Sequence, residues 1–389
     1  MEKMKITDSL KKYTMIIALV LVVAFFYWST EGKILYAQNI NNLISQNAYV
    51  FVLATGMLLC ILTGGNIDLS VGSVVCFVGG IGALIMDKKM SPWLAVIVML
   101  IVGLLVGMFQ GFWIAYIKVP PFIATLAGMY AFRGLSNVVL QGYAVSVSDT
   151  TFLNVFGGGA DCYVPNFFGG ETLNITCLAA GILITAFYIL LTIRNRIRKK
   201  TKGYATQPFA GELIKTVLIS AAIVWLFYKL SNYKGIPSAL IWIALVLLVY
   251  AYITSKTTIG RYLYAVGGNE KATRLSGVNT KKVYFFAYAN MGLLAGLAGI
   301  LTIARAASAQ PTYGQGYEMD AIAACFIGGA SAYGGVGSVV GMVVGATLMG
   351  VINQGMSIMG IEANYQKVVK GIVLLVAIIF DVMSKKEKK

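Results

Sequence analysis

The residues of this sequence that could do chemistry are a few acidic and amide side chains set in apolar stretches. Asp68 lies in "TGGNIDLSVGSVV" (63–75), between apolar runs at 53–62 and 71–78. Such a carboxylate could relay protons, bind a substrate, or cap the helix that begins after it. The chain has no histidine, which removes His-based triads and the ordinary proton shuttle. Helix capping at a glycine-hinged break is therefore the favoured interpretation, and direct contact with a substrate is the alternative.

Other charged residues also occur within apolar segments. Arg133, Arg305, Glu318 and Asp320 each lie at an expected helix end or beside glycines. This placement does not favour a proton-coupled carrier, although that class stays open. No G-x-x-x-x-G-K-[ST] motif is present, so no ATP-hydrolysing P-loop is expected. The chain is thus expected to be a transport pathway and no enzyme by itself. The energy for transport would come from an ion gradient or from a partner protein.

A second motif, "VGGNEKATRLSG" (266–277), has the ends of a short helix. Asn269 is a good N-cap residue, and Glu270 and Arg274 form an i, i+4 pair with the acid first. Gly277 suits the left-handed position that ends a helix. A helix of about seven residues, roughly 10 Å long, is predicted. It is either a lever that a cytosolic protein could grip or an ordinary loop helix.

Long apolar segments must position these residues. Of the 389 residues, 58% are hydrophobic and 12% are charged, and the apolar residues occur in blocks long enough to span a bilayer as helices. The fold class predicted is an all-α polytopic membrane protein of about 10 to 12 transmembrane helices, with half-helices possible. The expected helices are 13–30, 46–63, 69–86, 92–117, 121–140, 173–193, 209–229, 236–254, 283–306, 318–335, 338–357 and 366–383.

The basic residues set the expected orientation. Most of the 31 lysines and arginines fall in four segments: the N-terminus, 194–202, 256–282 and the C-terminus. Basic residues in alternate loops mark the cytoplasmic side, so both termini are expected there and no nucleic-acid partner is needed to explain the charge. A single permease-like domain is expected over 1–389: six helices in 13–193, an inserted basic loop and helix pair in 194–254, a cytoplasmic loop in 255–282, and the last helices in 283–383.

Four motifs resemble one known family. They are "TGGNIDLSVGSVV" (63–75), "VPPFIATLAGMYAFRGL" (119–135), "GRYLYAVGGNEKATRLSGVN" (260–279) and "GGASAYGGVGSVVGMVVGA" (328–346). In this order they resemble bacterial ABC-importer permeases for monosaccharides, and the length and inserted helix pair are most similar to the xylose or multiple-monosaccharide branch. The first and last motifs also resemble each other, running from a glycine pair to Val-Gly-Ser-Val-Val. Repeated halves or two independent glycine-rich helix starts explain this equally well.

The resemblance implies a multi-pass permease of the bacterial inner membrane with several partners. These are a cytosolic ATPase subunit that binds ATP, a second permease copy in a homodimer, an extracytoplasmic sugar-binding protein and membrane lipid. It implies no cofactor or metal on this chain. The residues expected to couple to the ATPase are Gly267, Gly268, Asn269, Glu270, Arg274 and Gly277.

Neutral sugars need hydrogen-bonding groups rather than a charged relay. The candidates for a substrate pathway are Asn66, Asp68, Asn353 and Gln354. The alternatives left open are an ion-coupled secondary sugar carrier and a membrane-embedded enzyme or scaffold.

Overall fold

The protein is almost entirely helical. The structure, a computed structural model, describes residues 2–170, 173–204 and 208–386. Its elements are α1 (Glu2–Ser29), η1 (Lys33–Leu35), α2 (Ala37–Gln46), α3 (Ala48–Leu62), α4 (Val71–Asp87), α5 (Pro92–Phe112), η2 (Trp113–Ile117), α6 (Pro121–Leu140), β1 (Val145–Ser146), α7 (Thr150–Phe156), α8 (Ile175–Thr201), α9 (Phe209–Ser231), α10 (Ser238–Lys256), α11 (Thr258–Gly268), α12 (Glu270–Leu275), α13 (Thr280–Ala306), β2 (Ser308–Ala309), α14 (Tyr317–Ile327), α15 (Val339–Ile358) and α16 (Ala363–Lys386).

Packing divides the chain into two compact units, where the sequence predicts a single domain over 1–389. Unit 1 comprises residues 1–34, 43–162 and 239–389, and unit 2 comprises residues 35–42 and 163–238. Unit 2 overlaps the predicted inserted segment 194–254 but begins earlier, because it includes all of α8. Helix α10, which the sequence places in the insertion, belongs to unit 1 except for Ser238.

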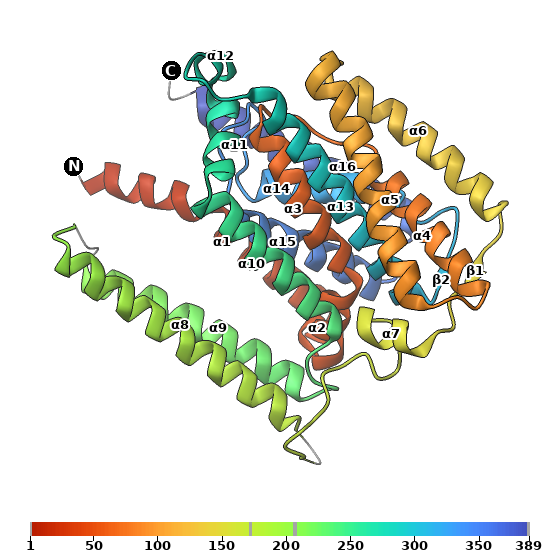
Figure 1. Ribbon diagram of the computed structural model, residues 1–389. Coiled ribbons are helices and arrows are strands. Elements are labelled where there is room, and N and C mark those ends of the chain that lie inside the picture. Colours follow the sequence, from red (N-terminus) through yellow and green to blue (C-terminus); the bar gives the residue numbers. More distant parts are fainter. Residues whose placement is uncertain (1, 171–172, 205–207, 387–389) are drawn as a thin grey trace. The chain divides into compact units, whose positions relative to one another are not determined.

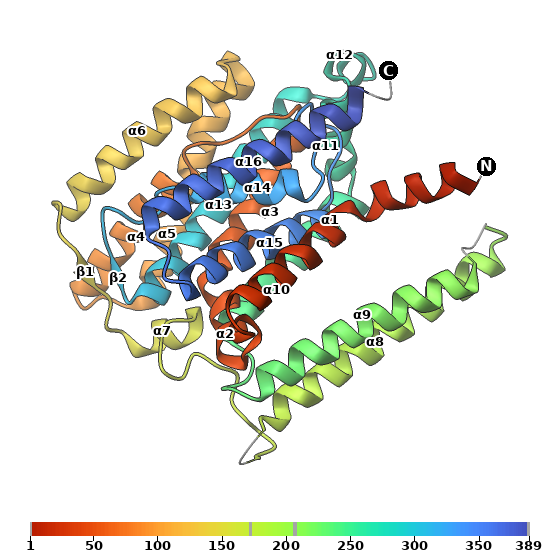
Figure 2. The ribbon, with the colours of Figure 1, turned by 180° about the vertical axis from the view of Figure 1, so that it is seen from behind.

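Helix α13 forms the centre of unit 1. It packs on α3, α4 and α5 and is buried along most of its length. Figure 1 shows α5 on one side of it, and Figure 2 shows α1, α14, α15 and α16 on the other. A helix that is apolar all round, such as this one, is stable only when neighbours cover every face.

Glycines bring α13 and α5 into close contact. A Cβ atom on Gly107 would lie 2.5 Å from the carbonyl oxygen of Tyr288, and one on Gly292 would lie 2.3 Å from the carbonyl oxygen of Gly103. Small residues spaced four apart let two membrane helices approach to backbone contact, where van der Waals packing holds them. The close crossing of α5 and α13 is therefore possible only because glycine has no side chain at these positions.

The structure confirms the fold class of an all-α polytopic membrane protein. Seven described helices are long and apolar enough to span a membrane, or eight if α2 and α3, which meet at a 43° bend, count as one span. Residues 15–29 of α1 and helix α4 are apolar but shorter. The predicted helix 121–140 is confirmed by α6, which begins at Pro121 because proline suits the first helical position.

The predicted span 318–335 is wrong. Helix α14 ends at Ile327 after 11 residues, and a non-helical segment follows until α15 begins at Val339. Gly334 and Gly335 in that segment have φ values of +82° and +68°, which a helix cannot contain. Helix α14 is thus one of the half-helices that the sequence allowed, and the count of full spans falls accordingly.

The two long helices of unit 2 form an antiparallel pair. Gly181 of α8 packs against Phe227 of α9, and the Cys177 thiol donates to the Phe227 carbonyl oxygen. Near the other end of the pair, Arg196 forms an ion pair with Glu212 and lies over the ring of Phe209. Most of the remaining apolar side chains of both helices are exposed, as expected where lipid is the solvent.

The α5–α13 crossing generates a stability prediction. We expect Gly107→Ala to destabilise the purified protein by about 1–3 kcal/mol, because overpacking forces two backbones apart. Gly134→Ala in α6 is the matched control, since nothing lies within 4 Å of a Cβ there. It should be neutral or stabilising, because alanine favours a helix over glycine. Thermal unfolding in detergent measures both, and an equal loss in both variants would contradict the crossing.

Candidate functional site

The short helix α12 has the N-terminal cap that the sequence predicts. It spans Glu270–Leu275, six residues, and Asn269 is its N-cap, whose side-chain oxygen accepts a hydrogen bond from the Ala272 N–H at 2.9 Å. The cap satisfies one of the free N–H groups of the first turn.

The C-terminal end of α12 is also fixed locally. The Gly277 N–H donates to the Arg274 carbonyl oxygen at 3.1 Å, and the Val278 N–H donates to the Thr273 carbonyl oxygen at 3.3 Å. Gly277 has a φ of +89°, so this is the two-bond Schellman ending, and the predicted helix-ending role of Gly277 is confirmed. Both ends of α12 are therefore closed by bonds within the segment, which makes a short helix rigid.

Glu270 ties α12 to the start of α13. Its carboxylate accepts hydrogen bonds from the Thr280 hydroxyl at 3.2 Å and the Tyr284 hydroxyl at 3.1 Å. The predicted i, i+4 ion pair with Arg274 is not formed among the described residues. Glu270 therefore acts as a tether between α12 and α13 through these two hydroxyl donors.

Three glycine-rich segments meet at the end of α11, just before α12 in the chain, and we call this contact the glycine junction. It comprises Leu62 at the end of α3, Gly64 and Gly65 after it, Gly267 at the end of α11, and Ala332, Gly334 and Gly335 before α15. The Gly335 N–H donates to the Leu62 carbonyl oxygen at 3.1 Å.

The glycine junction leaves no room for side chains. A Cβ atom on Gly267 would lie 1.8 Å from the Leu62 carbonyl oxygen, and one on Gly65 would lie 1.8 Å from the Ala332 carbonyl oxygen. The two segments that resemble each other in sequence, 63–75 and 327–340, thus touch each other, and the end of α11 contacts Leu62, just before the first segment, and Gly335 in the second. The backbone that carries α12 is in direct contact with both breaks of the helical bundle.

Helix α11 adds a side-chain bond to the same contact. The Tyr264 hydroxyl donates to the Gly337 carbonyl oxygen at 2.9 Å, and burial raises the pKa of Tyr264, so the phenol keeps the proton that it donates. The sequence predicts a loop with one short helix over 255–282, whereas the structure has a second helix there. The Thr257 side chain caps α11 by accepting from the Gly260 N–H.

A cavity of about 540 Å³, lined by both polar and apolar residues, opens beside α12, and we call it the basic pocket. Its lining residues come from the loop after α3, the η2–α6 linker, α12 and the start of α13. They include Asn66, Lys118, Glu270, Arg274, Gly277, Lys281 and Tyr284. The structure thus brings together Asn66, predicted for the substrate pathway, and three of the residues predicted for coupling.

Asp68 lies apart from the basic pocket and is buried. Its Oδ1 accepts from the Ser70 N–H at 2.8 Å and the Ser70 hydroxyl at 2.6 Å, and the Gln110 amide donates to the Ser70 oxygen at 2.7 Å. Ser70 is the N-cap residue of α4, but its side chain accepts no bond from the first turn. The capping interpretation therefore needs correction, because Asp68 organises the turn before α4 rather than the first turn itself.

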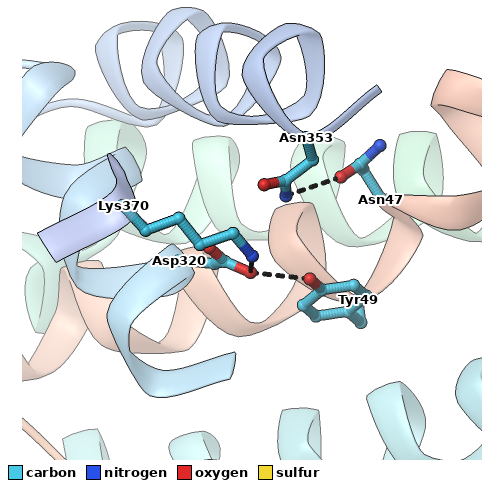
Figure 3. A network of polar contacts seen from close by, with 5 residues as sticks. All are labelled: Asn47, Tyr49, Asp320, Asn353 and Lys370. Atoms are coloured by element: carbon cyan, nitrogen blue, oxygen red, sulfur yellow. Dashed lines mark hydrogen bonds and ion pairs between the residues drawn. The ribbon is translucent and has the colours of Figure 1, made fainter. Parts of the chain in front are cut away.

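Asp320 and Asn353 stand out in the sequence, but the polar contacts that they make inside unit 1 were not predicted (Figure 3). The Lys370 ammonium lies 2.9 Å from Asp320 Oδ2, and the Tyr49 hydroxyl donates to the same oxygen at 2.7 Å. Asp320 is completely buried, and the Tyr49 ring stacks on Tyr317 with centroids 3.6 Å apart. Half-helix α14 is thereby bonded to α3 and α16.

Asn353 and Gln354, the other predicted pathway residues, lie on α15. The Asn353 amide donates to Asn47 Oδ1 at 3.2 Å (Figure 3), and Gln354 is buried. Asn353 Oδ1 and Gln354 Oε1 have no donor within the described residues. Buried acceptors without a donor are uncommon in folded proteins.

The structure also separates two adjacent glycines that the sequence analysis treats alike. The backbones of both glycines pack on Gly335, but a Cβ on Gly267 would overlap Leu62 and Gly335, whereas nothing is within 4 Å of a Cβ on Gly268. Residues that the sequence analysis did not select are Leu275, which is 79% exposed at the end of α12, and the pocket lysines Lys118 and Lys281. Leu275 could have been selected from the sequence, because it is an apolar residue in the otherwise polar stretch "NEKATRLSG".

The different surroundings of a Cβ atom at Gly267 and at Gly268 generate a prediction. We expect Gly267→Ala to separate α11 from Leu62 and Gly335 and to lower the midpoint of thermal unfolding, because the added methyl overlaps two backbone atoms. Gly268→Ala should leave the free energy of unfolding unchanged within about 1 kcal/mol, since that methyl would meet open space. Amide exchange of residues 329–337 measures the junction directly, and equal exchange in both variants would contradict it.

Comparisons with known proteins identify the family of the chain. A family model described as branched-chain amino acid transport system / permease component matches residues 39–169 and 166–378. The xylose transport system permease protein XylH of Escherichia coli (strain K12) is 37% identical over 388 residues, covering 97% of this chain and 93% of the relative. The XylH of Haemophilus influenzae is 36% identical over 380 residues, covering 97% of this chain and 98% of the relative.

Other relatives are named as ribose permeases. The ribose import permease protein RbsC of Escherichia coli (strain K12) is 33% identical over 343 residues, covering 88% of this chain and 85% of the relative. No solved structure matches the chain. With family matches over most of its length and relatives aligned nearly from end to end, the chain belongs to the family whose model is described as branched-chain amino acid transport system / permease component, and the resemblance to monosaccharide permeases seen in the sequence motifs is confirmed by these xylose and ribose permeases.

Proposed function

We propose that this chain is the membrane-spanning permease subunit of an ATP-driven importer that carries a monosaccharide across the bacterial inner membrane. ATP would be bound and hydrolysed by a separate cytosolic ATPase subunit, and no cofactor is assigned to this chain. An extracytoplasmic sugar-binding protein would deliver the substrate. A second copy of the chain would complete the pathway as a homodimer.

The observation that carries the proposal is the position of α12. It is a short helix closed at both ends, with an exposed leucine, on the backbone segment that contacts both breaks of the bundle. The lysines and arginines around it place it on the cytoplasmic side by the positive-inside rule. A cytosolic protein that moves α12 would therefore displace the glycine junction as well, because the contacts there are between backbones.

The proposed substrate class rests on the relatives. Those named above are called xylose and ribose permeases, whereas the family model has a branched-chain amino acid name. The individual relatives align with nearly the whole chain, so a pentose is the first substrate to test and a branched-chain amino acid is the second.

The chain offers hydrogen-bonding groups for a neutral substrate. Asn353 and Gln354 hold buried acceptors that lack donors within the described residues, and sugar hydroxyls are donors. Asn66 lines the basic pocket, and Asp68 is engaged by Ser70. We assign Asn353 and Gln354 to the substrate pathway, Asn66 to its cytoplasmic end and Asp68 to the shape of the turn beside it.

An ion-coupled secondary carrier is the alternative, because the buried Asp320 is the kind of residue that ion pathways use. Its carboxylate already pairs with Lys370 and Tyr49, which supports a structural role instead.

Transport by purified components tests the proposal. Proteoliposomes with this chain, its ATPase and its binding protein should accumulate radiolabelled xylose or ribose only when ATP is supplied on the ATPase side. A protonophore should not change the rate, and excess leucine should not compete. Uptake driven by a pH gradient through this chain alone would contradict the proposal in favour of the carrier. Competition by leucine without sugar uptake would reassign the substrate.

A further inference from the structure

The basic pocket carries more positive charge than its surroundings neutralise. Lys118, Arg274 and Lys281 line it from three different elements, and none forms an ion pair among the described residues. The one carboxylate in the lining, Glu270, is already engaged by Thr280 and Tyr284. The cavity therefore presents three cations whose natural complement is an anionic group from another molecule.

The backbone holds Lys118 at the pocket in an unusual conformation. Lys118 ends η2 with a φ of +64°, in the left-handed region, and Val119 donates its N–H back to the Trp113 carbonyl oxygen. Pro120 and Pro121 follow at once and start α6. Non-glycine residues in this region are uncommon and occur preferentially at binding and switch sites.

The surroundings of the pocket favour a protein over a small anion. All three cations are exposed, and an exposed charge binds a small ion weakly because water and salt screen it. A docked protein would remove that water and strengthen the same attraction. Leu275, on the same helix as Arg274, is 79% exposed, and a protein would bury this apolar side chain whereas a phosphate ion would not.

We propose that the basic pocket receives an acidic segment of the cytosolic ATPase partner, which thereby binds α12, α13 and the η2–α6 linker together. The inference rests on the proposed function and deepens it. The pocket volume of about 540 Å³ has room for several side chains. Charge contacts on three elements would move α12 together with the start of α13 and the end of η2, instead of bending α12 alone.

The experiment measures binding of the purified ATPase to the full-length permease in lipid nanodiscs at several salt concentrations. The pocket variant is Lys118→Gln with Lys281→Gln. Its matched control is Lys256→Gln with Lys282→Gln, which removes the same charge from exposed residues of the same side that do not line the cavity. We expect about a tenfold weaker Kd and a shallower salt dependence for the pocket variant, and less than about a threefold change for the control.

Three other outcomes would contradict either the inference or the proposed function. If both double variants weaken binding equally, the attraction belongs to the whole basic surface and the inference is wrong. If inorganic phosphate raises the melting temperature of the permease through Lys118 and Lys281, while ATPase binding is the same in both variants, the pocket is a small-anion site and the inference is also wrong. If the unaltered permease does not bind the ATPase at all, the proposed function itself fails.

Discussion

The close backbone contact at the glycine junction is the constraint on which the functional site depends. Leu62, Gly267 and Gly335 meet at distances that exclude even a methyl group. Two broken segments of the bundle and the end of α11 are thereby held against one another. Because packed backbones tend to shift as a body, the proposed coupling would pass a displacement of α12 to both breaks at once.

Two buried acids have partners inside the helical bundle, whereas the cations beside α12 are exposed and form no ion pair within the described residues. Inside unit 1, Asp320 is paired with Lys370 and Tyr49, and Asp68 is bonded to Ser70, so both of these buried acids have partners. Such pairing is required where water cannot solvate a charge. Beside α12, in contrast, cations and Leu275 are exposed. The bundle thus pairs these buried acids internally and leaves an unneutralised surface where the proposed partner docks.

The parts of the fold that local rules determine could be predicted from sequence. Pro121 starts α6, and Asn269 and Gly277 close α12, because each acts on the nearest turn of backbone. Long-range contacts could not be predicted. Nothing in the sequence distinguishes Gly267 from Gly268, and Asp320 and Lys370 are 50 residues apart. The i, i+4 rule predicted Arg274 as the ion-pair partner of Glu270. The rule considers one helix only, so it could not predict the hydroxyl donors that Thr280 and Tyr284 supply from α13.

The most direct test is whether α12 and the glycine junction move as one body. All five cysteines are buried, so spin labels can be attached selectively at Lys271→Cys, Val336→Cys and Val138→Cys, three exposed positions. Pulsed EPR on the spin-diluted complex with its ATPase would then compare the nucleotide-free and ATP-bound states. We predict that the 271–336 distance stays constant while the 271–138 distance changes. A change in the 271–336 distance as large as that in the 271–138 distance would contradict rigid coupling through the junction.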